Sequence, residues 1–447
     1  MFSTDDTIVA IATPLGRAGL GIVRLSGPRS AQIAAALVGR AKSFAPRHAT
    51  LASLTSPSAT DQVVVTVFPA PHSYTGEDVA EISAHGSPVV LQGILRAAIA
   101  AGARLAEPGE FTLRAFLNGK LDLIQAEAVA DLIDAVTPLQ ARVAFDQLEG
   151  TLTSAIAAIE ADLFDLMARL EASLDFPDEG YHFVTPEAAA GELGRIAERV
   201  DTLLAHASRG RLIREGAQVA IVGSPNVGKS SLFNALVNAE RAIVTPIPGT
   251  TRDLLTERAD ILGLPIGLID TAGLRQSVDV IEQEGIARAR HTVAVADLTM
   301  VVLDRSRPLG DDDRAVVEQT TSRPRVIVIN KIDLPAAWAT DVAGAVAVSV
   351  KTGEGLPSLI DRLAASLGAS SETRDMPLVT NVRHVSLLEH ARQAMERARL
   401  ALAEPATSEE FVLADVQDAA AHLQEITGRR TTDDLLRHIF ERFCIGK

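Results

Sequence analysis

The stretch from Val219 to Ser231 constrains the fold of this chain more than any other. It reads VAIVGSPNVGKSS, so four apolar residues precede a full match to the pattern G-x-x-x-x-G-K-S/T over Gly223–Ser230. Apolar residues at helical spacing follow, which predicts a strand, a phosphate-binding loop and a helix. Glycines let backbone N–H groups face phosphate oxygens, and the helix N-terminus adds positive potential. The pattern predicts an α/β domain in which Lys229 binds the outer phosphates and Ser230 binds Mg²⁺.

Three further motifs follow in the order typical of a GTP-binding domain. Thr250–Asp253 lies between the first helix and the next strand, where a threonine can reach the metal, and Asp270–Gly273 and Asn330–Asp333 each follow an apolar strand. The Asp333 carboxylate can accept hydrogen bonds from both N1–H and the amino group of guanine. Adenine has no such donor pair, so GTP is predicted rather than ATP. Ser349–Lys351 is a weaker match to a second base-contacting loop.

Hydrolysis needs a group that orients water and a positive charge beside the phosphates. Ras-like enzymes orient the water with a glutamine directly after the Asp-x-x-Gly motif, but Leu274 stands there in this chain. Glu282 is the best acid in reach by sequence, although it could equally be a solvated carboxylate at a helix start. Arg252, Arg275 or a bound cation could supply the positive charge.

The periodicity of apolar residues divides the rest of the chain. Residues 1–118 mix short strands and helices, with a turn predicted at Ala84–Gly86. Residues 119–215 and 372–447 are predicted to be helical, and residues 216–371 alternate strand and helix around a parallel sheet. Because neither helical part would bury much core alone, they are predicted to form one discontinuous helical domain with the α/β domain inserted between them.

Composition excludes several classes of protein. Apolar residues make up 47% and charged residues 22% of the 447, as in ordinary soluble globular proteins. The net charge of −15 argues against a protein that coats nucleic acid nonspecifically. Cys444 is the single cysteine, so no intrachain disulfide can form. No signal peptide or bilayer-spanning apolar run is recognised, and the cytoplasm is the expected compartment.

The whole chain resembles the MnmE (TrmE) family of tRNA modification GTPases. The resemblance rests on the GTPase motifs above and on four other segments: DTIVAIATPLGRAGLGIVRLSG, GEDVAEISAHG, PGEFTLRAFLNGKLDLIQAEA and the C-terminal LQEITGRRTTDDLLRHIFERFCIGK. It implies a folate-binding N-terminal α+β domain that dimerises, a split helical domain and an embedded Ras-like G domain.

The resemblance also implies how GTP is bound and cleaved. G domains of the family dimerise across their nucleotide faces when K⁺ binds, and the ion replaces an arginine finger. Glu282 would then be the acid that orients water. The implied metal ligands are Ser230 and Thr251 for Mg²⁺ and Asn226, Thr245, Ile247 and Thr250 for K⁺. The full set of GTP-binding residues is Asn226, Val227, Gly228, Lys229, Ser230, Ser231, Thr245, Pro246, Ile247, Pro248, Gly249, Thr250, Thr251, Asp270, Thr271, Ala272, Gly273, Asn330, Lys331, Asp333, Ser349 and Lys351.

Outside the G domain, the resemblance implies a formyl-tetrahydrofolate site made by Arg24, Glu81, Lys120 and Lys447. The family acts in a heterotetramer with an FAD-containing partner, MnmG (GidA). Together they add a carboxymethylaminomethyl or aminomethyl group at C5 of the wobble uridine of certain tRNAs. Cys444 is the candidate for the modification chemistry, and the alternative is a small buried hydrophobe beside the site.

The rival interpretation is a ribosome-assembly or signalling GTPase switch without modification chemistry. Relatives of that kind carry a second G domain or a C-terminal RNA-binding module with a GXXG loop. This sequence has one phosphate-loop motif and no GXXG after residue 370. The tRNA modification enzyme is therefore the favoured interpretation.

Overall fold

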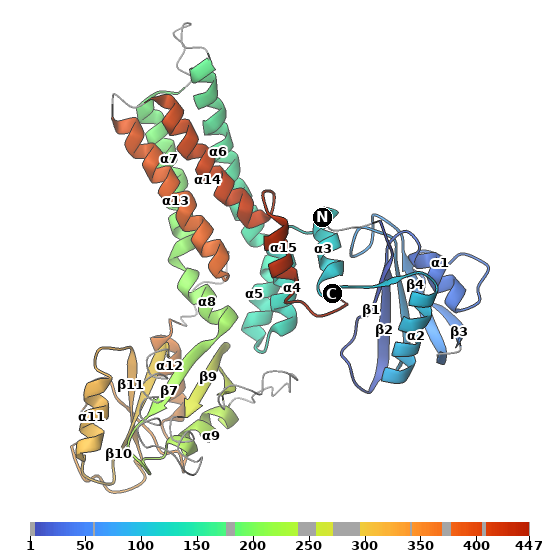
Figure 1. Ribbon diagram of the computed structural model, residues 1–447. Helices are drawn as coiled ribbons and strands as arrows, with labels where there is room; N and C mark the ends of the chain where they lie inside the picture. The colour runs from blue at the N-terminus through green and yellow to red at the C-terminus, as the bar shows by residue number, and fades with distance from the viewer. Residues whose placement is uncertain are drawn as a thin grey trace. The chain divides into compact units, whose positions relative to one another are not determined.

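The computed structural model describes residues 5–56, 59–175, 184–239, 256–270, 296–339, 342–368, 377–404 and 408–446 (Figure 1). The chain divides into two compact units. The first consists of residues 1–130, 147–160 and 420–447, and the second consists of residues 131–146 and 161–419. Among the described helices, none combines the length and the apolar character needed to cross a bilayer.

The first unit contains a six-stranded sheet in the order β3-β4-β5-β2-β1-β6, with helices α1 and α2 packed on it (Figure 1). Val23, Ile82 and Ile94 belong to the apolar core between the sheet and these helices, and none of the three is exposed. The elements are β1 (Ile8–Ile11), β2 (Ala18–Ser26), α1 (Ser30–Leu37), β3 (Thr50–Ser56), β4 (Ala59–Phe68), β5 (Val79–Gly86), α2 (Pro88–Ala100) and β6 (Arg104–Leu105).

The predicted turn at Ala84–Gly86 is wrong, because β5 continues through Gly86 and pairs with Ala18 of β2. Gly86 allows the backbones of β5 and β2 to approach closely, because it has no side chain. A Cβ at this position would lie 2.5 Å from the carbonyl oxygen of Ala18. A glycine in a strand often marks such an approach of two backbones, which the sequence pattern alone does not distinguish from a turn.

The C-terminal helix returns to the first unit. Helix α15 (Asp433–Phe440) packs against α3 (Glu110–Leu117), and Phe440 and Phe443 share an apolar cluster with Leu113. Thr432 caps the N-terminus of α15, because its hydroxyl accepts a hydrogen bond from the backbone N–H of Leu435 at 3.3 Å. The other helices that begin or end in this unit are α4 (Leu123–Asp134), α5 (Pro138–Leu148), α6 (Thr151–Asp175) and α14 (Glu409–Thr427).

In the second unit, helix α7 (Pro186–Ala205) runs beside α13 (Val382–Ala403), and Arg392 of α13 forms a salt bridge with Asp201 of α7 (Figure 1). The helical parts before and after the α/β sheet therefore pack together. Gly210 in α8 (Ala207–Glu215) lets the segment before α13 pass close to α8. A Cβ on Gly210 would lie 2.1 Å from the Val379 carbonyl oxygen. The predicted discontinuous helical domain is confirmed.

The sheet of the second unit has the order β12-β11-β10-β7-β9-β8. All neighbouring strands are parallel except β8, which pairs antiparallel with β9. The carboxyl ends of β7, β10 and β11 consequently meet at one edge of the sheet. The elements are α5 (Pro138–Leu148), β7 (Ala217–Val222), α9 (Lys229–Ala239), β8 (Thr256–Ile261), β9 (Leu264–Asp270), β10 (Leu298–Asp304), α11 (Asp311–Gln319), β11 (Arg325–Asn330), β12 (Val346–Ala347) and α12 (Leu356–Ser366).

These two sheets and the split helices confirm the predicted fold class, a mixture of α+β and α/β regions with a Ras-like parallel sheet. The exact boundaries at residues 118, 215 and 371 stay predictions.

A buried arginine joins separated parts of the first unit. The Arg114 side chain is 1% exposed and forms ion pairs with Asp6, Glu77 and Glu110. Burial acts to raise the pKa of Glu110, but hydrogen bonds from Arg104, the Glu107 backbone and Arg114 outweigh it, so the pKa lies below its ordinary value. These contacts connect the start of the chain, the loop before β5 and helix α3.

We expect Arg114→Met to destabilise the first unit by about 3–5 kcal/mol at neutral pH, because Glu110 and Glu77 would lose their buried partner. A carboxylate with a lowered pKa in the folded state stabilises the fold above its unfolded pKa, and that contribution disappears as the pH falls through the folded pKa. The penalty should therefore shrink below about pH 4, the ordinary carboxyl range.

Hydrogen exchange of β1 and β2 amides at several pH values measures this penalty within the first unit. Arg96→Met is the control, because Arg96 is an exposed arginine whose guanidinium reaches Gln92 at 3.5 Å. A loss of stability that is independent of pH, or equally large in Arg96→Met, would contradict stabilisation by ion pairs of Arg114.

Candidate functional site

The predicted phosphate loop connects β7 to α9 with a backbone turned into unusual conformations. Asn226 has a φ of 64° and Gly228 a φ of 100°. A Cβ on Gly228 would lie 2.3 Å from Nδ2 of Asn330, so only glycine fits between this loop and the end of β11. The Lys229 ammonium donates hydrogen bonds to the carbonyl oxygens of Gly223 at 3.0 Å and Ser224 at 2.8 Å. The lysine thus curls over the loop on which phosphates are predicted to bind.

Asn330 ties the base motif to the phosphate loop. Its side chain is 3% exposed, and its Nδ2 donates a hydrogen bond to the Val227 carbonyl oxygen at 2.9 Å. Its Oδ1 accepts a hydrogen bond from the backbone N–H of Lys331 at 2.8 Å. One amide therefore holds two motifs that lie far apart in the sequence, as expected where parallel strands end at one edge.

The second base-contacting loop also reaches the base motif. The Ser349 hydroxyl donates a hydrogen bond to Oδ1 of Asp333 at 2.8 Å and accepts one from the backbone N–H of Thr352 at 3.2 Å. Ser349 is fully buried, whereas Asp333 is exposed, so the carboxylate is held from the protein side and stays open to a ligand. The hydroxyl orients the carboxylate that is predicted to recognise guanine.

Part of the predicted GTP site lies outside the described residues. This holds for Thr245–Thr251 and Thr271–Gly273, for the proposed water-orienting Glu282, and for Arg252 and Arg275. Asp270 is the last residue of β9, and only its backbone is described. Within the described residues, no cluster of three or more His, Cys, Asp or Glu side chains is suited to a metal ion. That finding does not conflict with hydroxyl and carbonyl ligands such as Ser230.

Arg24, Glu81 and Lys120, three of the four predicted folate residues, belong to the first unit. Arg24 on β2 pairs with Glu81 on β5, with its Nε 2.9 Å from Oε1. The guanidinium carbon lies 5.6 Å from the ring centre of Tyr74 and 5.8 Å from that of Phe111. Lys120 donates a hydrogen bond to the Pro71 carbonyl oxygen at 3.2 Å.

The sequence analysis did not single out Tyr74 and Phe111. They come from a loop and a helix with no shared motif, and only the fold places both beside Arg24.

The C-terminal tail reaches the same cluster. Ile445 forms an antiparallel bridge with Pro108, and the Gly446 carbonyl oxygen lies 3.4 Å from Nη1 of Arg24. A Cβ on Gly446 would lie 2.5 Å from the Ile11 carbonyl oxygen, so the tail is closely packed here. Lys447 lies outside the described residues. Cys444 is exposed, which makes the alternative of a small buried hydrophobe wrong.

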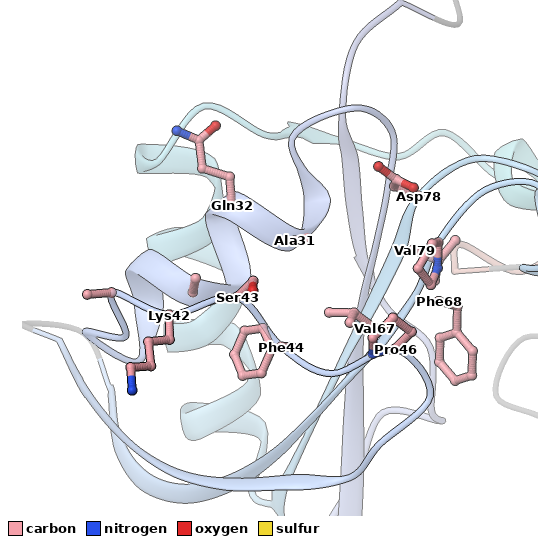
Figure 2. Close-up of a pocket in the computed structure, with 13 residues that line it drawn as sticks. Ala31, Gln32, Lys42, Ser43, Phe44, Pro46, Val67, Phe68, Asp78 and Val79 are labelled. Carbon is pink, nitrogen blue, oxygen red and sulfur yellow. The ribbon is translucent and has the colours of Figure 1, made fainter.

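A separate cavity of about 340 Å³ lies elsewhere in the first unit, between α1, the segment 41–46 and the end of β4 (Figure 2). Figure 2 shows the Phe44 ring and Val67 at its apolar side and Asp78 at another side. None of the predicted site residues lines it.

Comparison with known proteins gives the same family for both parts of the chain. The family described as "MnmE helical domain" matches residues 123–444, and "GTP-binding protein TrmE N-terminus" matches residues 7–120. Two relatives are each named tRNA modification GTPase MnmE. The one from Aquifex aeolicus is 43% identical, covering 99% of this chain and 100% of the relative. The one from Chloroflexus aurantiacus is 44% identical, with coverage of 99% and 100%.

Among solved structures, the G domain of the T. maritima FeoB iron transporter is 27% identical over 34% of this chain and 98% of that chain, with a TM-score of 0.25. Family membership rests on the sequence relatives.

We expect Gly228→Ala to weaken GTP binding by about tenfold or more, because the new methyl group would push the Asn330 amide away from the phosphate loop. Gly368→Ala is the matched control. Gly368 also has a left-handed φ, of 75°, but no atom lies within 4 Å of a Cβ built there. Isothermal titration with GTP measures both variants, and equal affinities in the two would contradict the assigned clash.

Proposed function

The chain belongs to the MnmE family of tRNA modification GTPases, and on that premise we propose that it is a K⁺-stimulated GTPase that modifies the wobble uridine of certain tRNAs. The observation that carries the proposal is the extent of the match. Relatives named for tRNA modification are similar over 99% of the chain, so the N-terminal and helical regions accompany the G domain. A ribosome-assembly switch would share only the G domain.

Guanine recognition is assigned to Asp333 and to the loop Ser349–Lys351, which contacts it. The Ser349 hydroxyl, 2.8 Å from Oδ1, holds the carboxylate in one orientation. Bound guanine supplies two N–H donors to this carboxylate, whereas bound adenine would leave it without them. An unmade hydrogen bond of this kind costs about 1–3 kcal/mol, enough for a clear preference. Lys351 belongs to the same loop.

Phosphate and metal binding are assigned to the loop after β7 and to the segment between α9 and β8. Ser230, at the start of α9, fits a Mg²⁺ ligand because it offers a hydroxyl beside the predicted phosphate position, and Thr251 is proposed as the second ligand. Asn226 is exposed, which leaves its side-chain oxygen accessible to K⁺. Thr245, Ile247 and Thr250 would complete the K⁺ site. Bound K⁺ would supply the positive charge of an arginine finger.

Glu282 is proposed to orient the attacking water. It stands in for the glutamine that Leu274 replaces, and it lies in the segment after the Asp-x-x-Gly motif. The proposed ligand set brings K⁺ to the face where a second G domain would pack, so hydrolysis would be coupled to dimerisation and to a change in domain arrangement.

The Arg24 cluster fits a formyl-tetrahydrofolate chemically. Glu81 can accept hydrogen bonds from the amino groups of a pterin, the partly exposed Tyr74 ring provides flat apolar surface, and Arg24 and Lys120 can bind carboxylates. Phe111 is fully buried and supports Arg24 from the core. The folate would supply a one-carbon unit when bound. Lys447 is proposed to join this site. Cys444 is exposed two residues before Gly446, so it stays the candidate for modification chemistry.

The proposed partners follow from the same family. A homodimer would act with the FAD-containing MnmG protein and tRNA in the cytoplasm. The FAD partner would provide the redox chemistry, while this chain would provide GTP hydrolysis and the one-carbon folate. The product would carry a carboxymethylaminomethyl or aminomethyl group at C5 of the wobble uridine.

GTP hydrolysis should be on the order of tenfold or more faster in KCl than in NaCl at equal ionic strength, because K⁺ would stabilise charge in the transition state. Steady-state phosphate release measures the rate in each salt. Asn226→Ala should abolish the difference between the two salts, since it removes a proposed K⁺ ligand. Equal rates for the unaltered chain in KCl and NaCl would remove K⁺ from the mechanism.

Cells that lack this protein should lose the C5 group on wobble uridines, and mass spectrometry of tRNA nucleosides detects that loss. The Glu282→Ala variant should fail to restore the modification, because it would bind GTP nearly normally but not hydrolyse it. Glu284→Ala, an acid two residues later, is the control and should restore it. Unchanged nucleosides in the deletion strain would favour the GTPase switch without modification chemistry.

A further inference from the structure

A carboxylate outside the four GTPase motifs lies at the centre of the nucleotide-binding loops. Asp304 is the last residue of β10 and is 5% exposed. Its Oδ2 lies 2.6 Å from the ammonium of Lys331, in the predicted guanine motif. Its Oδ1 accepts hydrogen bonds from Ser306, from the backbone N–H at 2.8 Å and from the hydroxyl at 2.6 Å. The two oxygens thus have separate partners.

Lys331 also contacts the phosphate loop. Its ammonium also donates a hydrogen bond to the carbonyl oxygen of Asn226 at 2.9 Å. Lys331 and Asn226 both have left-handed backbones, with φ of 66° and 64°. Such conformations are uncommon in residues other than glycine and persist only when surrounding contacts hold them. One ammonium therefore connects the end of β10, the guanine motif and the strained part of the phosphate loop.

The electrostatics favour an ionised Asp304. Burial acts to raise its pKa, but hydrogen bonds from Lys331 and Ser306 and the charge of Lys331 outweigh burial, so the pKa lies below its ordinary value. Arg307 is a more distant cation, with its Nε 3.8 Å from Oδ2 and its Nη2 3.7 Å from Asp313. The Asp304 carboxylate is buried and the Lys331 side chain is 31% exposed, and a charge-assisted hydrogen bond of 2.6 Å between them holds both side chains in place.

We propose that Asp304 is a positioning residue for guanine nucleotides, which holds Lys331 against the Asn226 carbonyl so that the base loop and the phosphate loop are joined before the nucleotide arrives. Asp304 itself touches neither base nor phosphate. Its effect is preorganisation, because a lysine already held in place loses less conformational freedom on binding. The inference rests on the nucleotide site proposed above.

Asp304→Asn should weaken GDP and IDP binding by the same factor, about tenfold, because the loss of charge loosens Lys331 and leaves the contacts of Asp333 unchanged. IDP lacks the amino group that Asp333 is proposed to recognise, so an unchanged GDP-to-IDP ratio separates positioning from base recognition. Asp313→Asn is the control. Asp313 is also buried and near Arg307, but its Oδ2 accepts the backbone N–H of Gly310 at 3.0 Å.

A double-mutant cycle tests whether Asp304 acts through Lys331. In a Lys331→Met background, Asp304→Asn should change GDP affinity less than twofold. A full tenfold loss in that background would show that Asp304 acts on the fold and would overturn the inference.

Ser306→Ala offers a second test, because it leaves the Asp304–Lys331 ion pair intact. This variant should keep GDP affinity within twofold. A loss as large as that of Asp304→Asn would also overturn the inference.

Failure of this inference can be told apart from failure of the nucleotide site. Asp333→Asn should move the preference from guanine to xanthine nucleotides, because an amide N–H can donate to the extra carbonyl of xanthine. If that switch occurs while Asp304→Asn binds GDP normally, only the positioning role is wrong. If the switch fails, the base assignment itself is wrong.

Discussion

The hydrogen bond from the Asn330 amide to the Val227 carbonyl oxygen is the contact on which the nucleotide-binding region depends. It requires that β7 and β11 end at the same edge of the sheet, with β10 between them. It also requires Gly228, since any side chain there would occupy the position of the amide. Strand order, loop conformation and base recognition are therefore parts of one constraint.

The first unit has a comparable centre in Arg114. A guanidinium that is 1% exposed would be costly without partners, and Asp6, Glu77 and Glu110 supply them from separate segments. The loop that carries Glu77 also carries Tyr74, which faces Arg24. The buried charge cluster thus supports the geometry of the proposed folate site without contributing to it directly.

Sequence patterns predicted the elements that are strongly periodic and missed those whose residues serve a distant contact. The sequence predicts β7 and β11 because a run of apolar residues precedes each motif, and β11 extends one residue further than predicted, to Asn330. Gly86 was interpreted as part of a turn, although it serves the pairing of β5 with β2. Asp304 ends β10 as Asn330 ends β11, so a search for polar residues at strand ends would have found it.

By itself, the sequence determined the phosphate loop, the guanine motif and the family, because each depends on residue types at short fixed spacings and on a match along the whole chain. Only the tertiary structure decided that Gly446 would meet Arg24 and that Lys331 would lie between Asp304 and Asn226. The physical reason is that these contacts join segments far apart in the sequence. Contacts between distant segments follow from strand order and helix packing, and the residues that make them carry no local pattern of their own.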